Sequence, residues 1–496
     1  MMFPAIRFAP ALCGLFLVSL LQGCINLGPD YVRPDAEVQV DWLNNTDSRV
    51  SSAPPTDPRW WQAAFHDAVL DQLLEMALQE NLTLRSAGLR VLQSQQQLAI
   101  AIGSQFPQQQ QATGSASRQK QNLLIFNNYN LGLNLGWELD FWGRFRRLVE
   151  SSSASLEASV AGYDAAMVSL VSQVSQNYIL IRTYEDRLVA ARLNIKLQEE
   201  SFRIATAKFN AGEVSELDVK QAETLLNNTR ASVPELEISL QQLKNSLTIL
   251  LGKPPHDMNS LLAETSGIPD APPSIALGMP QDLLRRRPDI RVAERQLAAQ
   301  SAQIGFAETD LYPHLSIGGT VGSSAMHSND LFKSETEFWS LLGAFEWDVL
   351  SYGRLSSNVR LQDAIFQQLL VDYRNQVLQA QGEAENAIVA YLKSHQQLES
   401  YRAASEASRR AVEVAVIRYQ EGEMDFNTLI TTLASNVQQQ DLLAATRGSV
   451  SSNLVQVYRA LGGGWELRDN RDPVEMLPDS TKNEMRARTN YWDGVW

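Results

Sequence analysis

The sequence predicts an α+β membrane protein made of two copies of one unit, each of which joins short strands to a long helical hairpin. Three observations lead to this prediction. Motifs recur along the 496-residue chain at a nearly constant spacing. Apolar and polar residues alternate strictly in short segments, which is typical of strands. Other segments, about 68 residues long, contain no proline and predict helices far longer than the usual globular helix.

Composition and charge exclude several classes of protein. Forty-two basic residues face 56 acidic ones, and the net charge of -14 argues against a nucleic-acid-binding surface. The mean hydropathy of -0.22 excludes a bundle of transmembrane helices. The two cysteines and five scattered histidines form neither a disulfide framework nor a metal site. No nucleophile–base constellation or phosphate-binding glycine loop occurs in the sequence, so we expect neither an enzyme nor a cofactor.

The N-terminus has the features of a lipoprotein signal. Arg7 precedes an apolar stretch from Ala11 to Leu21 that is too short to span a bilayer. A Leu-Gln-Gly segment then leads to Cys24, and together they look like a bacterial lipobox. We therefore expect residues 1–23 to be a signal peptide and Cys24 to carry a diacylglycerol and an acyl chain as a membrane anchor. Ile25, rather than an aspartate, follows the cysteine and resembles lipoproteins sorted to the outer membrane.

Self-similarity divides the rest of the chain into two units of about 200 residues. Three pairs of matching positions show the repeat: Trp137 and Trp347, Gly212 and Gly422, and Pro107 and Pro313. The first two pairs are 210 residues apart and the third is 206 residues apart. This change of register places a length difference of four residues between Pro107 and Trp137, where a loop is expected.

These features set the expected domain boundaries. The expected segments are a signal peptide (1–23), a lipidated N-terminal segment (24–65), repeat 1 (66–252), a linker (253–280), repeat 2 (281–462) and a C-terminal segment (463–496). The three segments outside the repeats are rich in proline and are expected to form a mixed belt around the middle of the protein. The tail from Asp472 onward is expected to lie outward or to be disordered.

Each repeat is expected to open with one helical stretch. In repeat 1 this stretch runs from Asp67 to Gln105, with apolar residues at steps of three and four. Pro107 ends it, because the residue before a proline disfavours the helical conformation.

Two strands are expected next in each repeat, at about residues 106–141 and 313–350. From Tyr129 to Phe141, every odd position from Leu131 to Leu139 is apolar and the even positions are small or polar. One apolar and one polar face fit a tilted membrane strand beside a wet lumen, although a half-buried soluble sheet would alternate in the same way. Four strands per chain cannot close a barrel. Association would close it, with 12 strands in a trimer or eight in a dimer.

Acidic residues at the ends of these strands are candidate lumen residues. Glu138, Asp140, Glu346 and Asp348 alternate with the apolar side chains. If they face the lumen, their negative potential would favour the passage of cations. Helix capping or hydrogen bonding between strands is the alternative role for them.

A long helical hairpin follows the strands in each repeat, over residues 143–252 and 353–462. Gly212 and Gly422 mark the turns between the two helices of each hairpin. The apolar stripes are thin, since polar residues interrupt Leu225, Leu226 and Leu236. Thin stripes with a polar opposite face favour a hollow helical tube over a solid soluble bundle.

Together these features resemble the TolC-type outer membrane factor family, in the NodT-type lipoprotein branch that serves RND multidrug efflux systems. The resemblance is carried by the segments at 27–31 (LGPDY), 60–62 (WWQ), 137–144 (WELDFWGR), 284–291 (LRRRPDIR) and 461–465 (LGGGW). It implies a homotrimer with a 12-stranded barrel in the outer membrane, continuous with a 12-helix periplasmic barrel. It also implies a passive, gated duct that exports drugs or other small toxic compounds, together with a membrane fusion protein and an inner-membrane RND pump as partners.

The resemblance further implies a gate at the hairpin tips. The family's latch, a tyrosine bonded to an aspartate, falls on Tyr419 and Asp218. The family's tip arginine falls on Met424, so a charged ring does not carry over in full. The family's lumenal aspartate ring falls on Thr428 and Thr431, which are possible tip-lumen residues, and Asp425 and Asn427 are the remaining polar candidates.

Three other functions stay open at this stage. A type I protein-secretion duct and a metal-efflux duct would share the architecture, although the methionines show no pairing that would support metal export. A coiled-coil envelope tether would not transport anything and would have no use for alternating strands.

Overall fold

The computed structural model describes residues 25–53, 57–121, 124–263 and 267–495. The expected signal peptide and Cys24 lie outside the described residues. The chain forms two compact units. Unit 1 contains the described residues up to Asp35 with Arg90–Ser159 and Val292–Arg374, and unit 2 contains Ala36–Leu89, Val160–Arg291 and the described residues from Asn375 onward. Each unit draws on both sequence repeats, so the repeats are not separate compact bodies.

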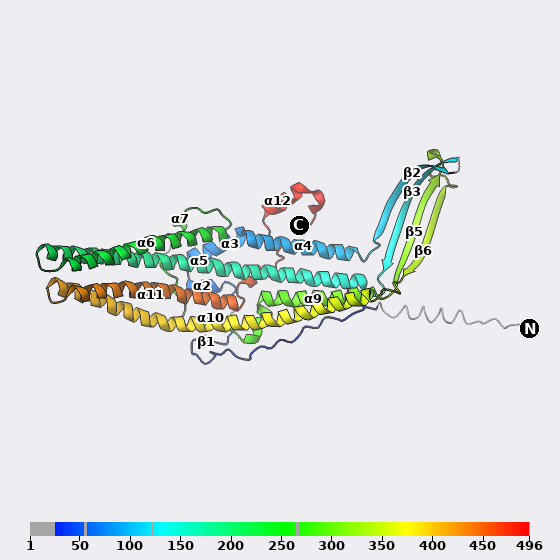
Figure 1. Cartoon of the computed structure of the whole chain (residues 1–496). Coiled ribbons are helices and arrows are strands. Elements are labelled where there is room, and N and C mark those ends of the chain that lie inside the picture. The colour runs from blue at the N-terminus through cyan, green and yellow to red at the C-terminus, as the bar shows by residue number, and fades with distance from the viewer. Residues whose placement is uncertain (1–24, 54–56, 122–123, 264–266, 496) are drawn as a thin grey trace, which may run out of the picture. The chain divides into compact units, whose positions relative to one another are not determined.

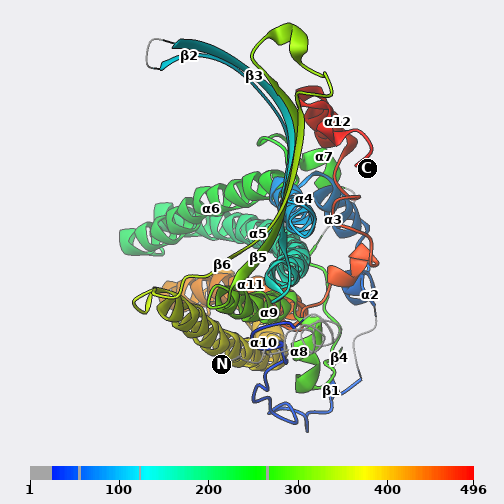
Figure 2. The same cartoon turned by 90° about the vertical axis from the view of Figure 1, so that its right-hand side faces the viewer.

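Unit 1 holds a four-stranded antiparallel sheet. Its strands are β2 (Gln109–Gln121), β3 (Leu124–Leu139), β5 (His314–Ala325) and β6 (Glu337–Glu346), in the order β2-β3-β5-β6. They lie side by side in Figure 1, and Figure 2 shows that they curve together. The two strands expected in each repeat are therefore present.

The last strand is shorter than the alternation predicted. We expected strand structure up to about residue 350, but β6 ends at Glu346. A backbone bond from Val349 N to Trp347 O, 2.9 Å long, turns the chain just beyond it. Trp347 and Val349 therefore lie outside the sheet, and their apolar side chains continued the alternation without continuing the strand.

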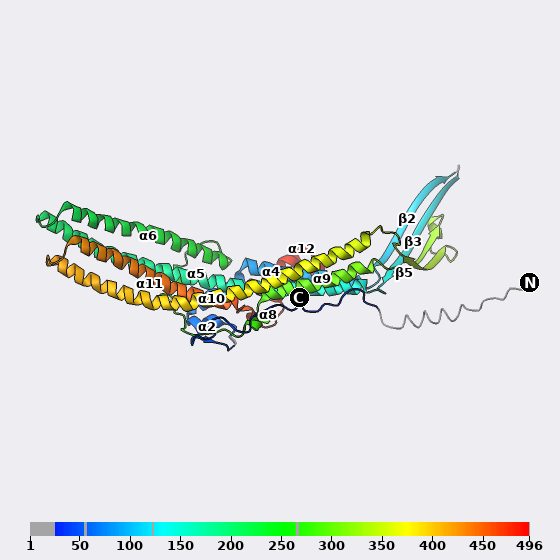
Figure 3. The same cartoon turned by 60° about the horizontal axis from the view of Figure 1, so that its bottom comes forward.

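The helices repeat in length as well as in order. The short helices α4 (Leu82–Gly103) and α9 (Pro288–Thr309) have 22 residues each. The long helices α5 (Arg144–Asn210) and α10 (Arg354–Gln420) have 67 each, and the returning helices α6 (Glu216–Leu250) and α11 (Phe426–Ala460) have 35 each. In unit 2, α6 runs beside α5 and α11 beside α10 (Figures 1 and 3). Equivalent helices of the two repeats begin 206 or 210 residues apart, which is the spacing of the sequence motifs.

The helix expected from Asp67 to Gln105 is broken. It forms α3 (Ala68–Glu80) and α4, with Asn81 in an extended conformation between them. The Asn81 side-chain oxygen accepts a 2.8 Å bond from Leu84 N, so the asparagine starts the second helix as an N-cap. Asp67 caps α3 in the same way, accepting bonds from Val69 N and Leu70 N.

The connecting segments fold into short elements in unit 2. They include α2 (Trp60–Phe65), α7 (Asn259–Leu262) and α12 (Asp479–Arg488), and α8 (Leu283–Arg286) follows just after the linker. Strand β1 (Val50–Ser51) pairs in parallel with β4 (Ile275–Ala276) and so ties the N-terminal segment to the linker. We call the described parts of 36–65, 253–280 and 463–495 the belt segments. Among the described residues, no helix combines the length and apolarity needed to cross a bilayer.

The described part of the C-terminal tail folds, so of the two expected alternatives the disordered one is wrong. Leu477 and Met485 are buried, and a Cβ atom at Gly88 would lie 3.0 Å from a Leu477 methyl carbon. The tail therefore packs on α4 through a few apolar side chains, which the polar sequence around them obscures.

One joint occurs twice in unit 2. In repeat 1, Asn81 Nδ2 donates a 2.8 Å bond to Leu250 O, the last carbonyl of α6. In repeat 2, Arg287 Nη1 donates a 3.0 Å bond to Ala460 O, the last carbonyl of α11. We call these the first and second joints. A neutral amide makes the first, and a charged guanidinium makes the second.

Candidate functional site

The sheet of unit 1 presents an apolar face to its surroundings. The strand register places Leu133 opposite Val321 and Val321 opposite Trp339, so the three side chains form a row across β3, β5 and β6. They are 60%, 56% and 79% exposed. A contiguous exposed apolar surface of this kind is unfavourable in water and is typical of a surface that contacts lipid or another protein.

The opposite face of the same sheet is polar. Asn134 donates a 3.1 Å bond to Thr113 on β2 and accepts a 3.0 Å bond from Thr320 on β5. These side-chain bonds run across three strands. The sheet therefore has one face suited to lipid and one suited to water, as the alternation predicted.

The predicted lumen acids lie where the strands end, and three of the four are engaged with basic groups. Glu138 lies 2.7 Å from His314 Nδ1 and 3.4 Å from Arg144 Nη1. Asp140 accepts bonds from the backbone N–H groups of Phe145 and Arg146, which caps the start of α5.

The equivalent acids of repeat 2 follow the same pattern in part. Asp348 pairs with Arg354 at 2.8 Å. Glu346 lies opposite His314 in the β5–β6 register. Arg144, Arg146 and Arg354 offset much of the negative charge of the acids they pair with. A lumen-facing role for the four acids stays a prediction.

The start of α5 also holds the N-terminal segment. The side chain of Arg147 is 1% exposed, and it donates bonds to Leu27 O (2.9 Å), Gly28 O (3.0 Å) and Asp30 Oδ1 (2.9 Å). A Cβ atom at Gly28, whose φ is +82°, would lie 2.3 Å from the Cα of Gly305. The residues that directly follow the predicted anchor position are therefore fixed against unit 1 by a buried cation and a backbone contact with no room for a side chain.

The hairpin tips of unit 2 turn at the two predicted glycines. Gly212 and Gly422 have φ values of 78° and 75°, a left-handed conformation that favours glycine. Bonds from Glu213 N to Lys208 O and from Glu423 N to Arg418 O close both helix ends in the same manner. The two tips are thus built alike.

The two predicted latch residues lie near each other without a hydrogen bond. Tyr419 is buried in a cluster with Ala205, Val412 and Leu429, and its hydroxyl makes no hydrogen bond within the described part of the chain. Burial, with a contribution from the negative charges of Asp218 and Glu213, raises the pKa of Tyr419. Asp218 Oδ2 instead accepts a 3.3 Å bond from Ser215 N at the start of α6.

The other predicted tip residues make local bonds. Asp425 caps α11, accepting 2.9 Å and 2.7 Å bonds from the backbone N–H and the hydroxyl of Thr428, and these bonds lower the pKa of Asp425. The Thr431 hydroxyl donates to Asn427 O. Their role in a lumen stays a prediction.

Comparison with known proteins identifies the family. The family described as outer membrane efflux protein matches residues 73–253 and 279–463, which is most of the chain. This chain belongs to the outer membrane efflux protein family.

Individual relatives agree with this assignment. The pyoverdine export outer membrane protein OpmQ of Pseudomonas putida is 31% identical over 439 residues, which cover 86% of this chain and 92% of that protein. Outer membrane protein OprJ of Pseudomonas aeruginosa is 30% identical over 461 residues, which cover 91% and 95%. The solved structure of the outer-membrane channel OprN has a TM-score of 0.83 and 33% identity, and the match covers 89% of this chain and 100% of that one.

The efflux protein is therefore an outer membrane protein with the fold of the TolC-like channels. It acts in efflux as a passive channel and not as an enzyme. The resemblance, the location and the export function predicted from the sequence are confirmed, and the envelope tether is ruled out.

The efflux protein also contains buried charges that were not among the predicted site residues. Asp164 is fully buried, 2.8 Å from Arg468 Nε and 3.5 Å from Arg291 Nη1. Burial raises the pKa of Asp164, against the opposing effect of Arg468. Arg147 and Arg287 are buried in the same way. The available signal was that Arg147 and Arg287 lie within or beside the segments that carry the family resemblance, but their burial depends on contacts with distant segments.

Proposed function

We propose that three copies of the efflux protein close a 12-stranded barrel in the outer membrane and continue as a 12-helix periplasmic barrel. The observation that carries the proposal is the sheet of unit 1. Its apolar face is exposed, and β2 and β6 each pair on one side only within the described residues. Open strand edges are not tolerated in lipid, so pairing β6 of one copy with β2 of the next would satisfy them.

The surrounding assignments follow from this arrangement. Cys24 would carry the lipid anchor, and Arg147 would hold the next residues at the base of the sheet. The exported compounds would be drugs or other small toxic molecules, delivered by an inner-membrane RND pump through a membrane fusion protein at the hairpin tips. The domain boundaries given above are part of the same proposal.

The oligomeric state and the conductance test the proposed duct together. We expect native mass spectrometry of the detergent-extracted, lipidated protein to give a trimer, because three four-stranded sheets leave no open edge. The same preparation should form ion-conducting pores in planar bilayers. A monomer, or a trimer that does not conduct, would overturn the proposal.

Replacing Tyr419 by Phe tests the tip latch. We propose that Asp218 exchanges its bond to Ser215 for one to the Tyr419 hydroxyl, which has no partner within the described residues, and thereby holds the tip shut. Tyr419→Phe should raise the single-channel conductance and let larger solutes leak through. Tyr401→Phe, on the same helix, serves as the control and should change neither. Equal conductance of Tyr419→Phe and the wild-type protein would refute the latch.

A further inference from the structure

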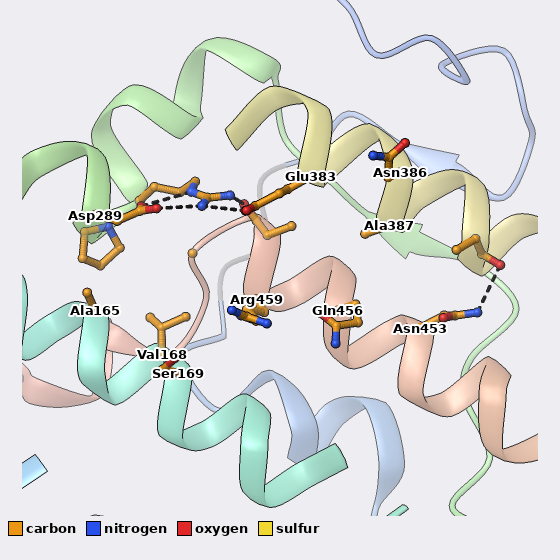
Figure 4. Close-up of a pocket in the computed structure, with 15 residues that line it drawn as sticks. Ala165, Val168, Ser169, Asp289, Glu383, Asn386, Ala387, Asn453, Gln456 and Arg459 are labelled. Atoms are coloured by element: carbon orange, nitrogen blue, oxygen red, sulfur yellow. Dashed lines mark hydrogen bonds and ion pairs between the residues drawn. The ribbon is translucent and has the colours of Figure 1, made fainter. Parts of the chain in front are cut away.

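A polar cleft of about 550 Å³ lies in unit 2 between α5, α10, α11 and the turn that joins α8 to α9 (Figure 4). Small apolar residues such as Val168 and Ala387 line part of it. Its charged residues are Arg287, Asp289, Glu383 and Arg459. Of these four, only Arg459 and Glu383 are substantially exposed.

The charges in the cleft are unevenly paired. Arg287 binds Asp289 through Nη2 at 2.7 Å and Glu383 at 2.8 Å, as the dashed lines in Figure 4 show. Arg459 makes no ion pair within the part of the chain that the structure describes, although it lines the same cleft. A solute in the cleft therefore meets one guanidinium that has no internal counter-charge and, beside it, a carboxylate that Arg287 partly neutralises.

Helix geometry separates the cleft from the belt segments on α10. Gln381 and Glu385 accept bonds from the backbone N–H groups of Gln39 and Leu43 in the belt segments. At about 100° per residue, Glu383 lies roughly 160–200° around the helix from these two residues. The cleft face of α10 is thus the one opposite the belt segments.

The separation between the cleft and the belt segments is smaller on α11. Ser451 bonds to Pro269 O, and Tyr458 stacks on Trp60 at 4.3 Å between ring centroids, so this face of α11 contacts the belt segments. Arg459 lies roughly 80–100° around the helix from both residues. The belt segments therefore contact α10 opposite Glu383 and contact α11 about a quarter turn from Arg459.

We propose that the cleft opens into the bore of the channel and that Arg459 and Glu383 set its charge selectivity. The inference rests on the proposed trimeric duct, because belt segments inside the bore would plug it and must lie outside. Three copies then place three Arg459 side chains around the bore at the level of the belt. These guanidinium groups would bind solutes that carry a carboxylate or phosphate group. They would do so although the net charge of the whole chain is -14.

Reversal potentials in planar bilayers under a KCl gradient test the inference. Arg459→Glu should raise the permeability ratio of K⁺ to Cl⁻ at least about twofold near 0.1 M salt, and the effect should shrink at 1 M, where screening is much stronger. Glu383→Gln should shift the ratio the other way, because it removes a negative charge and keeps an acceptor for Arg287. Arg402→Glu makes the same charge change on α10 outside the cleft, about 60° from Gln381 and about 100° from Glu383. It should leave the ratio unchanged.

The outcomes separate this inference from the proposed duct. A wild-type protein that does not conduct contradicts the duct itself. Conducting channels whose ratio is the same in Arg459→Glu, Glu383→Gln and the wild type contradict a bore-facing cleft. A shift in Arg402→Glu as large as that in Arg459→Glu contradicts it as well, since a remote charge would then act equally.

Discussion

Replacing Arg287 by Met should lower the free energy of unfolding by about 3–5 kcal/mol, the usual cost of removing one partner from a buried ion pair. Arg287 is almost fully buried and connects three groups: Asp289, Glu383 and the last carbonyl of α11. Methionine fills a similar volume but leaves Asp289 and the carbonyl without this partner. A melt followed by circular dichroism in detergent would measure the loss.

Two further variants sharpen the test. Arg287→Lys should recover only part of the stability. An ammonium group cannot make the bidentate hydrogen bonds to Asp289 and also reach Glu383 and Ala460 O. Arg402→Met removes an exposed pair with Glu399 and should cost about 1 kcal/mol or less. If Arg287→Met melts like Arg402→Met, the second joint does not stabilise unit 2.

Burial alone would raise the pKa of Asp289, but the hydrogen bonds and charge of Arg287 outweigh it and leave this pKa lowered. The carboxylate therefore stays charged at neutral pH and keeps its pairing with Arg287. This agrees with a structural role for the pair and explains why the loss of Arg287 is expected to be severe.

Replacing Arg147 by Met should release the N-terminal segment from unit 1. The side chain makes bonds to two backbone carbonyls, Leu27 O and Gly28 O, and to Asp30 and Glu150. Losing these charge-assisted bonds should cost about 2–4 kcal/mol, less than at Arg287, because Asp30 is exposed and Glu150 is partly exposed, so both stay hydrated. Limited proteolysis with mass spectrometry should then detect cleavage within residues 25–35 that the wild-type protein resists.

A matched variant and a second position check this result. Arg203→Met removes an exposed arginine paired with Glu200 and should leave the segment protected. Gly305→Ala should mimic Arg147→Met, since a Cβ atom at position 305 would lie 2.6 Å from Leu27 O and 2.8 Å from Arg147 Nε. If residues 25–35 stay protected in both Arg147→Met and Gly305→Ala, other contacts hold the segment.

The sequence was sufficient for the elements whose signals are local. Alternation located β3, β5 and β6, the absence of proline located α5 and α10, and the repeat spacing matched the helix register. The sequence was misleading where two local signals conflict, at Asn81 and at Trp347. Asn81 ends one helix and starts another, but its neighbours keep the apolar period of a single helix. Trp347 continues the alternation beyond the point where β6 ends. The strand ends there because the backbone turns, which the pattern of side chains does not reveal.

The site was harder to predict because its contacts join distant parts of the chain. Glu138 and Asp140 could be placed at strand ends, but their pairing with Arg144, His314 and Arg146 depends on how β3, β5 and α5 meet. The cleft around Arg459 combines residues from α5 through α11 and has no contiguous motif. Neither arrangement can be read from spacing along the chain.

The doubled joint bears on how this protein arose. Each half of the chain supplies the same set of helices and closes it with a bond to the equivalent terminal carbonyl. An ancestor with a single half would need six subunits to build the ring that we propose for three chains. Fusion of two such halves would halve that number and let them diverge, and an asparagine stands in one half where an arginine stands in the other. A chain made by joining two copies of the first half would retain the geometry and lose the ionic joint.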